Sequence, residues 1–116
     1  MKTILVVDDE PAIRDLLVEV LGDEGYHMLA AQDGLAALNL LQDMEVDLVI
    51  TDMMMPRRSG VELLQSMREH PRLKDVPAIL LSAAARPQLD GLGAFNFLPK
   101  PFDLAALLDA VSDALG

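Results

Sequence analysis

Residues 4–22 read ILVVDDEPAIRDLLVEVLG, and this stretch contains one complete strand-to-helix unit. Its first four residues form an unbroken aliphatic run, which is typical of a strand buried on both faces in a parallel sheet. The acidic pair Asp8-Asp9 ends that run. Apolar residues then recur at helical spacing over 13–21, after a Pro11 that suits the first turn of a helix. The stretch therefore predicts a buried strand, a polar turn and an amphipathic helix.

The same alternation of apolar runs and helical patterns continues along the chain. Further apolar runs predict strands at 28–31, 48–50, 78–81 and 95–98. The runs at 28–31 and 95–98 are weaker and suit the edges of a sheet. Helical patterns that begin with a capping residue occur at 33–41, 59–67 and 103–115. The pattern predicts an α/β fold in three layers. Its centre is a doubly wound, five-stranded parallel sheet with right-handed crossovers, in a single domain over residues 1–116.

The composition of the 116 residues restricts the classes of function. Hydrophobic residues make up 52%, which is enough for a buried core, and aromatic residues make up only 3%, so the core must be aliphatic. The net charge of −10 argues against independent binding to nucleic acid or to a membrane surface. The absence of cysteine excludes disulfides, cysteine-bound zinc and thiol catalysis, and it fits a reducing cytoplasm. No apolar run approaches the roughly 18 residues of a membrane span.

Polar side chains that could take part in catalysis or metal binding follow the ends of the predicted strands. Asp8-Asp9 end the first strand, Asp52 follows the third, Ser82 ends the fourth and Lys100 follows the fifth. In such folds, ligands bind at the carboxyl ends of the strands. Neighbouring strands lie about 4.8 Å apart, so the strand order 2-1-3-4-5 brings the acidic residues and Ser82 into one pocket within reach of the lysine. The order 3-2-1-4-5 would move Asp52 to an edge about 10 Å from the first strand. We therefore expect the order 2-1-3-4-5.

Several carboxylates in one pocket repel one another, by about 4 kcal/mol for two like charges 4 Å apart at an effective dielectric constant of 20. A hard divalent cation and a lysine are the natural remedies, and a set of oxygen ligands suits Mg²⁺. Carboxylates, a hard cation, a lysine and a hydroxyl group together suit phosphoryl transfer, with an aspartate as nucleophile. Asp8 or Asp9 could also cap the helix that begins near Pro11, and one can cap while the other binds metal.

These residues lie within four stretches of sequence that together resemble the receiver domain of two-component response regulators, the CheY-like fold. The stretches are 4–10, 47–56 with Gly60, 80–83 and 97–102. In this order they are highly specific, and the resemblance covers essentially the whole chain. It implies the flavodoxin-like strand order 2-1-3-4-5 and a Mg²⁺-dependent phosphoryl transfer to an aspartate.

The resemblance also implies which residues carry the chemistry. Asp52 is expected to be the phospho-acceptor, receiving its phosphoryl group from the phosphohistidine of a histidine kinase or from a small phosphodonor. The Mg²⁺ ligands are expected to be Asp8, Asp9, Asp52 and the backbone carbonyl of Met54, with Asp9 as the direct carboxylate ligand and Asp8 acting more through water. Ser82 is expected to donate to the transferred phosphoryl group.

Three further expectations follow from the resemblance. Lys100 should pair with a phosphate oxygen, and with a carboxylate before phosphorylation, and its bond to Pro101 should be a cis peptide. Phe97 occupies the family's aromatic switch position, where movement of Ser82 would let the ring turn inward and reshape a protein-binding face. Met54 and Ala84 occupy positions that tune access of water to the acyl phosphate. Because both side chains are apolar, we expect slow self-dephosphorylation.

The sequence departs from the family between Ser82 and Lys100, which are closer together than usual by roughly one helical turn of about four residues. The loss falls on the helix between the fourth and fifth strands, which Pro87, Gly91 and Gly93 weaken further. We expect a shortened helix there. The phosphorylation chemistry should survive because the strand ends are intact, whereas the usual output and dimer face is put in doubt.

The sequence therefore predicts a cytoplasmic, phosphorylation-controlled switch without enzymatic turnover. Its expected partners are a sensor histidine kinase or phosphotransfer protein and a downstream effector protein or a missing output domain, with homodimerisation left open. One rival is a receiver-like scaffold that does not depend on phosphorylation. The other is a Mg²⁺-dependent phosphatase that forms an aspartyl phosphate. Phosphatases of the haloacid-dehalogenase type place their second aspartate two residues after the first, whereas Asp8 and Asp9 are adjacent and Glu10-Pro11 follow.

Overall fold

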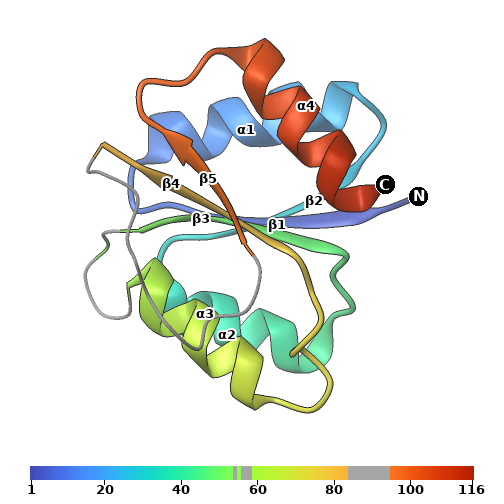
Figure 1. Ribbon diagram of the computed structural model, residues 1–116, viewed down its shortest axis with the longest axis vertical. Coiled ribbons are helices and arrows are strands. Elements are labelled where there is room, and N and C mark those ends of the chain that lie inside the picture. Colours follow the sequence, from blue (N-terminus) through green and yellow to red (C-terminus); the bar gives the residue numbers. More distant parts are fainter. Residues whose placement is uncertain (54, 56–58, 84–94) are drawn as a thin grey trace.

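Strands and helices alternate from β1 to β4 in a computed structural model that describes residues 1–53, 55, 59–83 and 95–116. The elements are β1 (Thr3–Val7), α1 (Pro11–Asp23), β2 (His27–Ala31), α2 (Gly34–Asp43), β3 (Leu48–Asp52), α3 (Gly60–Glu69), β4 (Ala78–Ser82), β5 (Asn96–Pro99) and α4 (Leu104–Leu115). Figure 1 shows the three layers: α1 and α4 cover one face of the sheet, and α2 and α3 cover the other. The predicted three-layer α/β class is confirmed.

The strands form one parallel sheet in the order β2-β1-β3-β4-β5. The order predicted from the strand-end residues is therefore confirmed, and the two weaker runs form the outer strands of the described sheet. Val7 pairs with Thr51, and Asp52 pairs with Leu81. The first residue after β1 therefore lies level with the end of β3.

Side chains alternate between two aliphatic cores along each strand. On β1, Ile4 and Val6 pack beneath α1 and α4, whereas their neighbours pack against α2 and α3. The same alternation, continued one residue past the strand, directs Asp8 to the α1–α4 side. Asp52 lies on that side too, since it follows the buried Ile50 by two residues. The pairing of strands and the alternation of side chains together bring these carboxylates to one corner of the molecule.

Local capping agrees with the sequence in three helices and departs from it in α1. Asp33 accepts a hydrogen bond from the Ala36 amide at the start of α2, and Asp103 accepts one from the Ala106 amide at the start of α4. Ser59 and Glu62 form a complete capping box at the start of α3. In α1 the N-cap residue is Glu10, whose side chain makes no capping bond. Neither Asp8 nor Asp9 is therefore the N-cap of α1.

Three leucines on the helices are partly exposed. Leu16, Leu35 and Leu104, which the helical patterns place on apolar stripes, are about 40% exposed because they lie at the margins of the buried faces. The shortened helix expected between β4 and β5 falls on residues 84–94, outside the described residues. Among the described helices, none has both the length and the hydropathy to cross a membrane.

Candidate functional site

A pocket of three carboxylates and one ammonium group lies at the carboxyl ends of β1 and β3. The Nζ atom of Lys100 lies 3.4 Å from Asp8 Oδ2 and 3.4 Å from Asp52 Oδ2. It also lies 3.5 Å from Oε1 of Glu10, at the start of α1. We call these four residues the carboxylate pocket. The structure thus brings together Asp8, Asp52 and Lys100, as the sequence predicts, and it adds Glu10.

The electrostatics of the pocket show a balance between burial and charge pairing. Asp8 is completely buried, and burial raises the pKa of its carboxyl group even though the Glu10 amide and Lys100 stabilise the charged form. Burial alone would lower the pKa of Lys100, but the carboxylates of Asp8 and Asp52 outweigh it, and the pKa of Lys100 is raised. The lysine therefore stays charged at neutral pH, whereas burial disfavours the ionised form of Asp8.

Asp8 lies in the loop between β1 and α1, and each of its polar groups has a hydrogen-bond partner. Its amide donates to the carbonyl oxygen of Ala31 on β2 at 3.2 Å. Its Oδ1 accepts from the Glu10 amide at 2.9 Å, and its carbonyl oxygen accepts from Nη1 of Arg14 at 2.7 Å. With Lys100 on Oδ2, this carboxylate has one orientation in the pocket.

Close backbone packing fixes the end of β3. The Gly60 amide donates to the carbonyl oxygen of Met53 at 3.0 Å, so the start of α3 lies against the strand end. A Cβ atom on Gly60 would fall well inside van der Waals contact with the carbonyl oxygen of Asp52. Only glycine lets α3 approach this closely, which ties the position of Asp52 to the start of α3.

Ser82 and Phe97 belong to the face of the sheet that packs towards α3. Ser82 is buried and follows Leu80 by two residues, so it continues the face of β4 that packs towards α3. Phe97 packs against the same small core as Leu80. The Lys100 amide donates to the Ser82 carbonyl oxygen at 2.8 Å, and the Lys100–Pro101 peptide bond is cis, as the resemblance implies.

The carboxylates have the arrangement that a hard cation requires. Oxygen atoms of Asp8, Glu10 and Asp52 lie within 4.8 Å of one another, and oxygen ligands of this kind suit Mg²⁺. Asp9 is exposed, and within the described residues it does not belong to this group. The donor set therefore fits the expected metal, with Glu10 facing the pocket where the sequence suggested Asp9.

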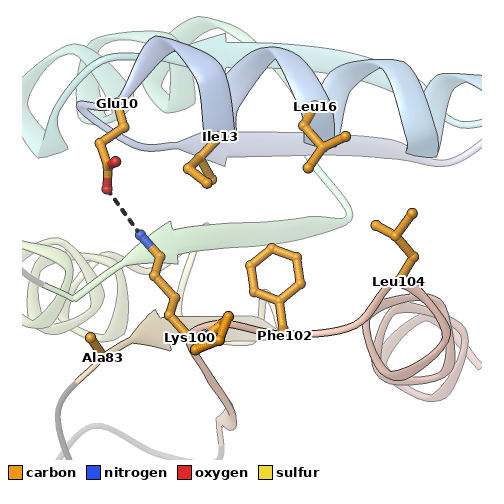
Figure 2. Close-up of a pocket in the computed structure, with 8 residues that line it drawn as sticks. Glu10, Ile13, Leu16, Ala83, Lys100, Phe102 and Leu104 are labelled. Carbon is orange, nitrogen blue, oxygen red and sulfur yellow. Dashed lines mark ion pairs between the residues drawn. The ribbon is translucent and has the colours of Figure 1, made fainter.

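An apolar groove adjoins the carboxylate pocket. It has a volume of about 420 Å³ and is lined by Glu10, Ile13, Leu16, Ala83, Lys100, Pro101, Phe102 and Leu104. Figure 2 shows the side chains of Ile13 and Leu16 on α1 facing the ring of Phe102, with the Glu10–Lys100 ion pair at one end. We call this surface the α1–α4 groove. Its polar end is thus also the rim of the carboxylate pocket.

Two site residues named from the sequence, Met54 and Ala84, lie outside the described residues. Their roles as a carbonyl ligand and in tuning dephosphorylation stay predictions. Sequence reasoning in turn missed Glu10 and Arg14. Glu10 could have been suspected because it directly follows the acidic pair, whereas the contact of Arg14 with a backbone carbonyl leaves no signal in the pattern of residue types.

Comparisons with known proteins agree with this geometry. The family model described as the response regulator receiver domain matches residues 4–112. The transcriptional regulatory protein CpxR of Klebsiella pneumoniae is 42% identical over 89% of this chain and 44% of its own length. The chain spans about half the length of the curated relatives that it matches first.

Two solved structures show the same fold across the whole chain. The chemotaxis protein CheY4 of Vibrio cholerae superposes with a TM-score of 0.93 at 32% identity, covering 99% of both chains. The response regulator TrrA of Thermotoga maritima, in a complex with Mg²⁺ and BeF, has a TM-score of 0.88 at 40% identity, covering 99% of this chain and all of its own. TrrA has also been solved in complex with the histidine kinase ThkA. The chain therefore belongs to the response regulator receiver domain family of two-component systems.

Proposed function

We propose that Asp52 accepts a phosphoryl group from a phosphohistidine of a sensor histidine kinase or phosphotransfer protein, or from a small phosphodonor. The observation that carries this proposal is the carboxylate pocket, in which Lys100 lies 3.4 Å from both Asp8 and Asp52. A carboxylate oxygen of Asp52 attacks phosphorus, a P–O bond forms and the P–N bond to the donor imidazole breaks. The imidazole nitrogen keeps the electron pair and takes up a proton.

The neighbouring residues support this transfer by charge and hydrogen bonding. Lys100, already paired with Asp52, is suited to follow the new negative charge onto a phosphate oxygen. Ser82 is proposed to donate to the phosphoryl group. Its place on the same face as Phe97 supports the proposal that phosphorylation moves the aromatic ring and alters a protein-binding face. Because the product stays attached to the chain, we propose a switch and not an enzyme with turnover.

Mg²⁺ is the cofactor that fits the donor set, and a bound Mg²⁺ would offset negative charge on the transferred group. We propose that Asp8, Asp9, Asp52 and the carbonyl oxygen of Met54 hold the ion. Asp9 and Met54 enter this set from the family motif, whereas the proximity of Asp8 and Asp52 supports the other two. Glu10 lies close enough to these carboxylates to add to the field at the ion.

We propose that residues 1–116 act as one receiver domain in the cytoplasm, controlling a downstream effector protein or an attached output domain. Its phosphodonor protein is proposed to dock over the α1–α4 groove. A donor that delivers a phosphoryl group to Asp52 must pass the rim formed by Glu10 and Lys100, and these two residues also line the groove. The exposed Leu16 and Leu104 offer apolar anchors there.

A comparison of two phosphodonors tests the docking proposal. Leu16→Arg should slow phosphorylation by the cognate kinase at least 10-fold, because it places a charge on an apolar docking surface. The same variant should react with acetyl phosphate at the wild-type rate. Leu35→Arg, an equally exposed leucine on α2 across the sheet, is the matched control for both donors. Equal loss with both donors would locate the defect in the pocket and not in docking.

The transfer itself is tested by mass spectrometry after incubation with acetyl phosphate and Mg²⁺. Wild-type protein should gain one phosphate, and Asp52→Asn should gain none. Equal labelling of the two proteins would remove Asp52 from its role. Absence of an acyl phosphate even with a cognate kinase would favour a phosphorylation-independent scaffold, and turnover of a generic phosphomonoester would favour a phosphatase.

A further inference from the structure

We propose that Arg14 is a positioning residue for the carboxylate pocket, an inference that rests on the proposed metal-dependent function. Arg14 lies on α1 and is half-buried. Its Nη1 atom donates to the backbone carbonyl oxygen of Asp8 at 2.7 Å. Through this bond the guanidinium group fixes the turn that carries Asp8, Asp9 and Glu10.

The contact of Arg14 completes the set of bonds that orient Asp8. Val7 is the last residue of β1, so the carbonyl oxygen of Asp8 lies beyond the ladder of strand hydrogen bonds. The Asp8 amide and both carboxylate oxygens have partners in Ala31, Glu10 and Lys100. The remaining polar atom is the carbonyl oxygen of Asp8, and Arg14 donates to it. Inside a sheet, a neighbouring strand would supply such a donor.

The position of Arg14 is not explained by the stability of α1. A positive charge in the first turns of a helix opposes the helix dipole, and the first turn of α1 holds no acidic residue to offset it. The N-cap residue Glu10 has the charge that a helix start favours, but its side chain pairs with Lys100 instead of capping the helix. Glu10 and Arg14 therefore serve the turn and the pocket.

A purely electrostatic role for Arg14 predicts the opposite effect on metal binding. Removing a positive charge near the pocket would strengthen the attraction for a divalent cation. Removing a clamp on the turn would instead let the carboxylates lose their common orientation and weaken binding. The sign of the change in Mg²⁺ affinity therefore separates the two roles.

The test is isothermal titration of Mg²⁺ into the full chain. Arg14→Met should raise the Kd for Mg²⁺ about 10-fold, the scale of losses seen when a partner that orients a metal ligand is removed. Arg14→Lys keeps the positive charge and a hydrogen-bond donor on a flexible side chain. Its Kd for Mg²⁺ should therefore fall between those of wild type and Arg14→Met. In the metal-free protein, the Glu10 amide, which donates to Asp8, should exchange its hydrogen faster in Arg14→Met.

Arg68→Met is the matched control. The Nη1 atom of Arg68 also donates to backbone carbonyls, those of Lys74 and Val76, but at the opposite end of the sheet. This variant loses the same charge and a similar bond, so it should lower thermal stability while leaving the Kd for Mg²⁺ within twofold of wild type.

The possible outcomes separate this inference from the proposed function. If Arg14→Met folds, a Kd for Mg²⁺ that is unchanged or lower overturns the role of Arg14 alone. If Arg14→Met does not fold, a Kd in Arg14→Lys equal to that of wild type does the same. Failure of the wild-type protein to bind Mg²⁺ overturns the metal site itself, and this inference with it.

Discussion

The two ends of the parallel sheet use charged side chains in opposite ways. At the amino ends of the strands, the exposed Asp47 accepts a hydrogen bond from the Thr3 amide at 2.8 Å. Arg68 binds the carbonyl oxygens that precede β4. Each charge there satisfies backbone groups, with Asp47 exposed and Arg68 half-buried. At the carboxyl ends, three carboxylates share the single ammonium group of Lys100.

This contrast separates charges that support the fold from charges that support the site. Burial raises the pKa of Asp8, which means that its ionised form is under strain in the folded protein. A fold selected for stability alone would not place two buried acidic residues beside a third. The two ends should therefore respond differently to substitution, to Mg²⁺ and to pH.

The largest effect is expected where the backbone itself approaches the site. Gly60→Ala should lower the free energy of unfolding by about 3 kcal/mol, because its Cβ atom would overlap the backbone of Asp52. Gly22→Ala, near the end of α1, is the control: its Cβ atom would meet only Met28 Cγ, at 3.9 Å, and should raise stability by about 0.5 kcal/mol. Urea unfolding measures both, and equal stabilities of the two variants would contradict the close approach at Asp52.

Mg²⁺ should stabilise the carboxyl end specifically. At a concentration of 100 times its Kd, the ion should raise the free energy of unfolding by about 2.7 kcal/mol, by mass action on the folded state. Asp47→Asn, at the amino end, should show the same gain, whereas Asp52→Asn should lose most of it. Thermal unfolding with and without Mg²⁺ measures the gain. An equal gain in all three proteins would locate the ion away from the pocket.

Most of the fold could be predicted because its signals are local. Aliphatic runs and helical spacing place the strands and helices, and capping residues such as Asp33 and Ser59 mark helix starts that the structure confirms. Strand order followed from chemistry, since one order gathers the polar strand ends and another disperses them. The exposure of Leu16 was not predictable in this way, because a helical stripe does not reveal how far the covering layer extends.

The site was only partly predictable. Residue types at the strand ends indicated Asp8, Asp52 and Lys100, and the structure brings these three together. The pattern could not tell which side chain of the acidic turn faces the lysine, because that depends on backbone directions after β1. Glu10 takes that place in the structure, and the contact of Arg14 with a carbonyl oxygen is equally invisible to residue type.

A smaller effect is expected from removing the strained charge. At pH 7 and without Mg²⁺, Asp8→Asn should raise the free energy of unfolding by about 1 kcal/mol. Gains of this size are typical when a functional residue that destabilises the fold is replaced. Asp47→Asn should change stability by less than about 0.5 kcal/mol, as surface substitutions do. Lower stability of Asp8→Asn than of wild type at pH 7 would show that the pocket is a net stabilising feature.

The pH dependence of stability should distinguish Asp8→Asn from Asp47→Asn most clearly. Because the pKa of Asp8 is raised above its ordinary value of 3.8, its contribution to stability is fully present below that value and is lost as the pH rises through the raised pKa. Asparagine resembles the protonated form of aspartate. The gain in the free energy of unfolding of Asp8→Asn over wild type should therefore vanish in acid and grow as the pH rises from 3.8 through the raised pKa. The difference between Asp47→Asn and wild type should show no such rise. Urea unfolding of the three proteins from pH 3.5 to pH 7 measures both curves, and a constant advantage of Asp8→Asn would attribute the gain to packing instead of charge.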